Sequence, residues 1–117
     1  MGLTYIMGDL IGKDETVETV EFLVDSGASY TLLPKDIWQK LEIKPKKKQS
    51  FTLADGTHME RNISECYIKI LGEEGHTTVI LGEEGDEALL GVFTLEQFGL
   101  MLNPFSRTVQ PMVLRLA

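Results

Sequence analysis

Short apolar runs broken by polar turns predict a chain that is mainly β-strand. Val17, Val20, Phe22 and Val24 indicate a strand, and Thr57–Ile70 is expected as one return strand or a pair of strands. Within it, Cys66, Ile68 and Ile70 alternate with Tyr67 and Lys69, and a period of two is typical of strands with one buried face. Further short strands are expected at three places, Thr4–Leu10, Thr31–Leu33 and Gln49–Ala54. The pattern therefore favours an all-β fold in which helix plays a minor part.

One short helix is predicted in the first half of the chain. Pro34 suits the first position of a helix, where its missing N–H needs no partner, and Asp36 places negative charge in the first turn. Trp38 shares one face of this helix with Ile37 and Leu41. We expect Trp38 to anchor the helix to the core, since large aromatic side chains are usually mostly buried.

A second helix of about two turns is predicted later in the chain. Thr94 and Gln97 have the spacing of a capping box, and Gly99 is suited to ending the helix. Two apolar segments follow, Leu100–Leu102 and Val109–Leu116. We expect these segments to form short strands that pair in a subunit interface.

Three polar segments are predicted as turns. Asp55-Gly56 is a strong hairpin signal. The pentapeptide Leu-Gly-Glu-Glu-Gly occurs at 71–75 and again at 81–85, on either side of one apolar strand, and both copies are expected as turns. The acidic residues at 83–87 lack the ordered spacing of a calcium-binding loop, so a solvated acidic loop is expected there.

Length and cysteine content narrow the class of protein. The 117 residues, 43% of them hydrophobic, suit one domain spanning 1–117. Cys66 is the only cysteine, so no disulfide forms within the chain, and we interpret it as a reduced structural thiol. No signal-peptide pattern opens the sequence, and no apolar run reaches membrane-spanning length. We therefore expect a cytoplasmic protein without membrane association.

The charge of the chain argues against nucleic acid as its partner. The formal net charge is -7, whereas binding to phosphates needs an excess of Lys and Arg on one face. The one basic cluster contains Lys44, Lys46, Lys47 and Lys48. We interpret it as a solvated linker between helix and strand, and an anionic docking patch is the alternative.

The stretch from Val20 to Pro34 holds the strongest candidate for chemistry. Its apolar run at 22–24, which suits a strand buried on both faces, ends at Asp25. A carboxylate in that position must be solvated by a cleft, hydrogen-bonded or partly protonated, because desolvating a lone charge is costly. Ser26 can brace the following turn, and Gly27 permits close approach of another backbone. An isolated Asp-Ser-Gly is also a common polar turn, so the flanking residues decide between the two interpretations.

This run resembles the active-site turn of the retropepsin-like aspartic proteases, the family of the retroviral proteases and of small bacterial and archaeal relatives. Farther along, Ala88-Leu89-Leu90-Gly91 is similar to the apolar-apolar-glycine element of that family. The resemblance implies an all-β acid protease barrel with one or two short helices and one half-site per chain. It places Leu89, Leu90 and Gly91 in a psi-shaped loop beside the catalytic turn. It also implies that a hairpin folds over the substrate as a flap, with the tip Ala54, Asp55, Gly56 and Thr57.

The resemblance further implies an aspartic endopeptidase that acts on peptide or protein substrates without a metal or other cofactor. This chemistry needs two carboxyl groups that share one proton and one water. The chain contains a single Asp-Ser/Thr-Gly sequence, so a second Asp25 must come from a partner chain in a symmetric homodimer. Ser26 is implied to bond across the interface, and Gly27, Ala28 and Ser29 to border the substrate. Ser29 stands where many retroviral enzymes carry a second aspartate that holds the substrate backbone.

Two other interpretations remain. The chain can be a dimerisation or peptide-binding module that keeps the fold without catalysis, since fold alone does not imply function. Loss of Asp25 or Gly56 would favour that module, and both residues are present. The chain can also be an acidic structural domain in which Asp-Ser-Gly is only a turn. That interpretation leaves the apolar strand before Asp25 and the Leu89–Gly91 element unexplained.

Overall fold

A computed structural model describes residues 2–113, in which nine strands and two short helices follow one another. Their bounds, in chain order, are β1 (Tyr5–Ile11), β2 (Val17–Val24), β3 (Thr31–Leu33), α1 (Lys35–Lys40), β4 (Lys47–Thr52), β5 (His58–Ile70), β6 (Glu73–Leu81), β7 (Leu89–Leu90), α2 (Val92–Gln97), β8 (Leu100–Asn103) and β9 (Thr108–Pro111). The prediction of an all-β protein with one or two short helices is confirmed.

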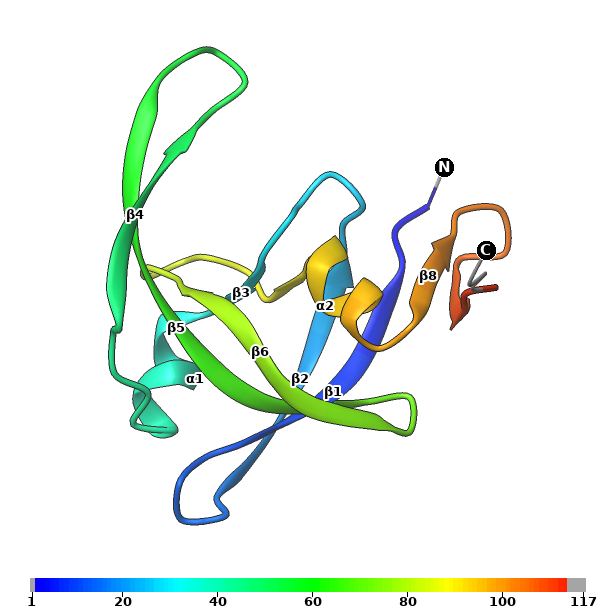
Figure 1. Ribbon diagram of the computed structural model, residues 1–117, viewed down its shortest axis with the longest axis horizontal. Coiled ribbons are helices and arrows are strands. Elements are labelled where there is room, and N and C mark those ends of the chain that lie inside the picture. The colour runs from blue at the N-terminus through cyan, green and yellow to red at the C-terminus, as the bar shows by residue number, and fades with distance from the viewer. Residues whose placement is uncertain (1, 114–117) are drawn as a thin grey trace.

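Seven of the strands form one sheet that curls into a ring (Figure 1). The order is β1-β2-β7-β3-β6-β5-β4, and β1 also pairs with β5, which closes a ring of six strands. β4 lies outside the ring and pairs only with β5, and the β4–β5 hairpin extends away from the barrel in Figure 1. Strands β8 and β9 pair with each other in a separate two-stranded sheet.

The core fills the ring with alternate residues of its strands. Leu10, Phe22 and Ile68 have no exposed surface, and they come from three different strands, β1, β2 and β5. The expectation that the run at 22–24 is buried on both faces is wrong at Leu23, which is partly exposed. The sheet is a single curved layer, so one face of β2 points into the core and the other is only partly covered.

Helix α1 begins one residue later than predicted. Pro34 has ψ 151° and precedes the helix as its N-cap residue, because the chain leaves β3 in an extended conformation. Trp38 is partly buried against the core, and its Nε1–H donates to the backbone oxygen of Gly82 at 2.8 Å. This bond ties α1 to the loop after β6, and Trp38 has the anchoring position that was expected.

The two copies of Leu-Gly-Glu-Glu-Gly differ in structure. In the first copy only Leu71 and Gly72 form the turn, with φ of 47° and 82°, and Glu73–Gly75 already belong to β6. The second copy is a turn closed by a bond from the Asp86 N–H to the Glu83 oxygen at 3.1 Å. The expectation that both copies are turns is wrong for Glu73–Gly75, because Glu73 pairs with Ile70 across the hairpin, and strand pairing overrides local polarity.

The basic cluster is only partly a linker. Lys44 and Lys46 precede β4, but Lys47 and Lys48 form its first two positions, opposite Ile63 and Asn62. All four lysines are exposed. Lysine on an edge strand is common because its charge opposes edge-to-edge association.

Cys66 lies in β5 with 5% of its surface exposed, and burial raises the pKa of its thiol to about 12. Thiolate is the reactive form, so at about pH 8 we expect a maleimide reagent to label the folded protein on the order of 10²-fold or more slowly than the protein in denaturant. The raised pKa also favours the protonated thiol in the fold. Its contribution to stability is therefore complete below the pKa of the unfolded thiol and declines as pH rises toward 12. Equal labelling rates with and without denaturant would contradict this burial.

Candidate active site

Asp25 directly follows β2 and opens a tight turn. Its Oδ1 accepts the N–H of Gly27 at 2.8 Å, and its backbone oxygen accepts the N–H of Ala28 at 3.0 Å. Asp25 is partly exposed, while Ser26, Gly27 and Ser29 are exposed. The carboxylate is therefore both hydrogen-bonded and in contact with solvent, which removes the desolvation cost that its position after an apolar strand suggested. The hydroxyls of Ser26 and Ser29 make no hydrogen bond to any residue between 2 and 113.

Strand β7 lies between the two strands that flank this turn. Leu89 and Leu90 run parallel to Leu23 and Val24 of β2, and Leu89 is also opposite Leu32 of β3, antiparallel. The Asp25 N–H donates to the Leu90 oxygen at 3.3 Å. The structure thus brings the Leu89–Gly91 element beside the Asp25 turn.

Gly91 is packed against the backbone of the turn. A Cβ atom on Gly91 would lie 2.4 Å from the carbonyl carbon of Tyr30 and 2.6 Å from the carbonyl oxygen of Ser29. Gly91 has φ -89° and ψ 165°, a conformation open to any residue. Glycine is therefore required at this position for space and not for backbone conformation.

Helix α2 begins at the same place and is capped by the turn itself. The N–H groups of Val92 and Phe93 donate to the carbonyl oxygens of Ala28 and Ser29 at 2.9 and 3.0 Å. The predicted capping box at Thr94 is wrong, because the N-cap residue is Gly91, three positions earlier, and Thr94 lies inside the helix. Backbone oxygens that are distant in sequence satisfy the free N–H groups of the helix, so no capping side chain is needed.

The hydroxyl of Thr94 is buried and belongs to a chain of hydrogen bonds. Its Oγ1 lies 2.6 Å from Oγ1 of Thr31 and 2.8 Å from Oγ1 of Thr77. Thr31 Oγ1 also accepts the N–H of Gly91 at 3.1 Å. These three threonines link β3, β6 and α2 behind the Asp25 turn. Sequence reasoning missed them; their only signal was a hydroxyl at each of three positions that turned out to be buried.

The β4–β5 hairpin carries the residues expected in the flap. Residues 53–57 connect the two strands, and the Leu53 N–H donates to the Thr57 oxygen at 2.7 Å, which leaves a loop of three residues, 54–56. Within the loop the Gly56 N–H donates to the Leu53 oxygen at 2.9 Å, and Gly56 has φ 88°. The expected two-residue turn at Asp55-Gly56 is thus replaced by a three-residue loop with a left-handed glycine. Asp55 Oδ1 accepts bonds from the hydroxyl and the N–H of Thr57, and these bonds, the hydroxyl first, hold the pKa of Asp55 below its ordinary value.

Tyr30 joins this hairpin to the Asp25 turn. Its ring meets Phe51 of β4 edge-to-face at a centroid distance of 5.8 Å, and Phe93 of α2 at 5.4 Å. Its hydroxyl accepts a long bond of 3.5 Å from the Gln49 side chain. Sequence reasoning missed Tyr30, although its position five residues after Asp25 was visible. The structure leaves Ala54–Thr57 exposed at the hairpin tip, away from the body of the barrel in Figure 1.

Residues 2–113 contain no group of three His, Cys, Asp or Glu side chains arranged as metal ligands. In the same residues no helix has the length and apolar character to cross a membrane.

Two comparisons with known proteins bear on this site. A sequence model described as gag-polyprotein putative aspartyl protease matches residues 16–97, which include the Asp25 turn, the hairpin and β7. None of the curated proteins compared with the chain matches it. The family match covers well over half of the chain, and the mainly β ring fits a protease of this kind. The chain therefore belongs to the family of gag-polyprotein putative aspartyl proteases, a retropepsin-like family.

Proposed function

We propose that the protein is an aspartic endopeptidase that works as a symmetric homodimer, with one Asp25 from each subunit at the two-fold axis. The observation that carries this proposal is the exposed turn at the end of β2, where a single carboxylate is held by the Gly27 N–H and left open to solvent. Family membership supports a protease in general terms.

The chemistry requires two carboxyl groups around one water. One acts as general base on the water while the other, protonated, donates to the oxygen of the scissile carbonyl. The working pair carries one proton, so we expect activity to fall at both ends of the pH range. In this proposal Ser26 bonds across the interface, Gly27 and Ala28 border the substrate backbone, and Ser29 takes the place of an aspartate found in many retroviral enzymes.

A screen of a peptide library with the purified chain tests the proposal. Cleavage of defined bonds supports an endopeptidase, and mass spectrometry of the products identifies those bonds. Binding of peptides without cleavage at any pH would instead favour a non-catalytic peptide-binding module with the same fold.

Exposed apolar residues near the Asp25 turn support a dimer. Leu3 is 65% exposed, and the β8–β9 region adds Phe105 at 94% and Val113 at 89%. The segment before β1 connects the β8–β9 region to the end of β2. Arg107, in the turn between β8 and β9, lies against Gly2, and the oxygen of Thr4 accepts the N–H of Val24 at 2.8 Å. Exposed apolar patches often mark an interface, and in this proposal these side chains take part in one. The C-terminal part of the expected interface strands, from residue 114 on, lies outside the described residues.

We expect sedimentation velocity to show a species of twice the chain mass of 13.1 kDa at concentrations on the order of 10 µM. Asp25→Asn should sediment in the same way, because the substitution leaves the apolar surface unchanged. A monomer at every concentration, with and without a bound peptide, would remove the catalytic proposal, since the chain has no second carboxylate of this type.

We further propose that the hairpin tip Ala54–Thr57 closes over bound peptide. Gly56 has φ 88°, and a Cβ there would meet nothing within 4 Å, so Gly56→Val changes only the backbone preference. We expect kcat/KM to fall about 10-fold, because the tight turn costs on the order of 1–2 kcal/mol more with valine. Gly72→Val is the matched control, since Gly72 also has open space and φ 82° but lies in the β5–β6 turn. Equal losses in both variants would argue against a lid.

A further inference from the structure

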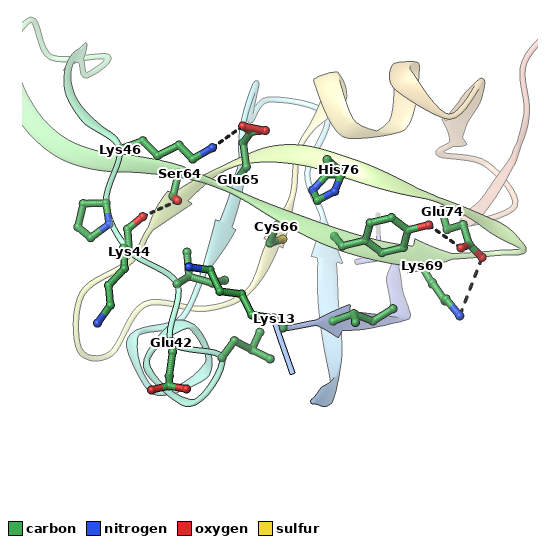
Figure 2. A pocket seen from close by; sticks show the side chains of 16 residues that line it. Lys13, Glu42, Lys44, Lys46, Ser64, Glu65, Cys66, Lys69, Glu74 and His76 are labelled. Carbon is green, nitrogen blue, oxygen red and sulfur yellow. Dashed lines mark hydrogen bonds and ion pairs between the residues drawn. The ribbon is translucent and has the colours of Figure 1, made fainter. Parts of the chain in front are cut away.

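A cleft of about 690 Å³ lies where the sheet separates between β4 and β1 (Figure 2). One wall is the end of β1 and the residues after it, 11–13, and another is the loop after α1, 41–46. The third wall is β5 at 64–67, with Lys69 and the β6 residues Glu74 and His76 at one end. None of the residues of the Asp25 turn or the hairpin tip lines this cleft.

β5 pairs with β6 along this wall, but its opposite edge has a gap with no strand partner. β4 pairs with β5 only as far as Ile63, and β1 pairs with it from Tyr67 onward. Peptide groups along a strand alternate between its two sides, and the Ile63 oxygen faces β4, where it accepts the N–H of Lys46 at 2.8 Å. The peptide groups of Glu65 therefore face the gap between β4 and β1. This edge, one residue long, has the donor and acceptor that an extended peptide can use.

The cleft has an apolar floor with lysines around it. The floor is formed by Ile11, Leu41, Ile43, Pro45 and Cys66. Four of the eight lysines in the chain line the cleft, although the net charge of the chain is -7. Lys46 pairs with Glu65 at 2.8 Å, and Lys69 lies 3.9 Å from Glu74.

Lys13 and Lys44 have no ion pair with any residue in 2–113. Figure 2 shows the Lys13 side chain extended over the middle of the cleft. The third acid on the rim, Glu42, also has no ion pair among these residues. The cleft therefore has two free cations against one free carboxylate, which matches a ligand with a single negative charge.

We propose that this cleft binds the C-terminal end of a peptide. The last side chain, an apolar one, packs on the floor, one backbone amide pairs with Glu65, and the terminal carboxylate lies between Lys13 and Lys44. Glu42, Glu65 and Glu74 disfavour a polyanion such as a nucleotide, and an internal peptide segment has no terminal carboxylate for the two lysines. The site uses none of the residues proposed for catalysis, so it does not rest on the peptidase proposal.

The test uses the full chain with Asp25→Asn, so that no peptide is cut, labelled with ¹⁵N. The probe is acetyl-Ala-Leu-Phe with a free carboxylate, and its C-terminal amide is the matched ligand. We expect saturable shifts of the Gly12 and Glu65 amide signals, and binding of the acid about 10-fold tighter than of the amide at low salt. Added salt should reduce this preference, because exposed charges are screened.

Lys13→Glu combined with Lys44→Glu should abolish the preference for the acid. Lys35→Glu combined with Lys48→Glu makes the same change in charge outside the cleft and should keep the preference. Equal affinities of acid and amide for the parent protein would overturn the proposal, and this comparison needs no lysine variant to fold. Shifts confined to residues 25–29 and 54–57, or no shift with millimolar peptide, would overturn it as well.

Discussion

Asp25→Asn should reduce peptide cleavage by a factor on the order of 10²–10⁴ or more while leaving the fold in place. The asparagine amide can neither take a proton from the water nor share one with its partner. Its Oδ1 can still accept the Gly27 N–H that Asp25 accepts at 2.8 Å, so the turn keeps its bond. Because the side chain is partly exposed, we expect the free energy of unfolding to change by less than about 0.5 kcal/mol.

The measurement is the initial rate of cleavage of a substrate found in the library screen, with equilibrium unfolding and sedimentation on the same preparation. Asp14→Asn is the control, because Asp14 is an exposed carboxylate in the turn after β1 and the change in charge is the same. Parent-like cleavage by Asp25→Asn would refute the mechanism. A loss of cleavage accompanied by a lost dimer would assign Asp25 to assembly instead.

Gly91→Ala should cost about 3 kcal/mol or more of folding stability and also remove activity. The new Cβ would lie 2.4 and 2.5 Å from the carbonyl carbon and oxygen of Tyr30. These are backbone atoms, so the clash cannot be relieved by rotating a side chain, and the Asp25 turn or α2 must move. Movement of either element breaks the bonds from Val92 and Phe93 to the turn.

Gly75→Ala is the matched control for this prediction. A Cβ on Gly75 would meet the Phe98 ring at 3.2 Å, a side chain that can shift, and Gly75 lies inside β6, where alanine is tolerated better than glycine. Urea unfolding at one protein concentration measures both variants, because the stability of a dimer depends on concentration. Similar midpoints for Gly91→Ala and Gly75→Ala would show that the packing against Tyr30 is less tight than the structure has it.

Local sequence patterns were enough to predict most of the strands and to identify the family. The alternation in β2 and β5 arises because one side of each strand faces the core, and side chains alternate between the two sides of a strand. Asp25-Ser26-Gly27 after an apolar run, followed later by Leu89-Leu90-Gly91, indicated the aspartic protease family, and the family match confirms it. The residue roles inferred from that resemblance stay predictions until the variants are measured.

Errors in the sequence analysis occurred where backbone pairing replaces the structure that residue type alone suggests. Thr94 has the spacing of a capping residue, but α2 is capped by the oxygens of Ala28 and Ser29, which the sequence places more than sixty positions away from it. These tertiary backbone bonds outweigh a capping preference worth on the order of 1 kcal/mol. Glu73 has the residue type of a turn, but it lies in β6 because it pairs with Ile70, its neighbour across the hairpin.

The sequence by itself determined the strand pattern, the polar turns and the single Asp-Ser-Gly motif, since these depend on residue type and on neighbours a few positions away. Tertiary structure decided that Gly91 must be glycine for lack of space and that Thr31, Thr77 and Thr94 share one buried chain of hydrogen bonds. It also decided that the edge of β5 opposite β6 is left unpaired at Glu65, between β4 and β1. Each of these features depends on how a closed ring of strands brings distant backbone together, and no local pattern of residues encodes that closure.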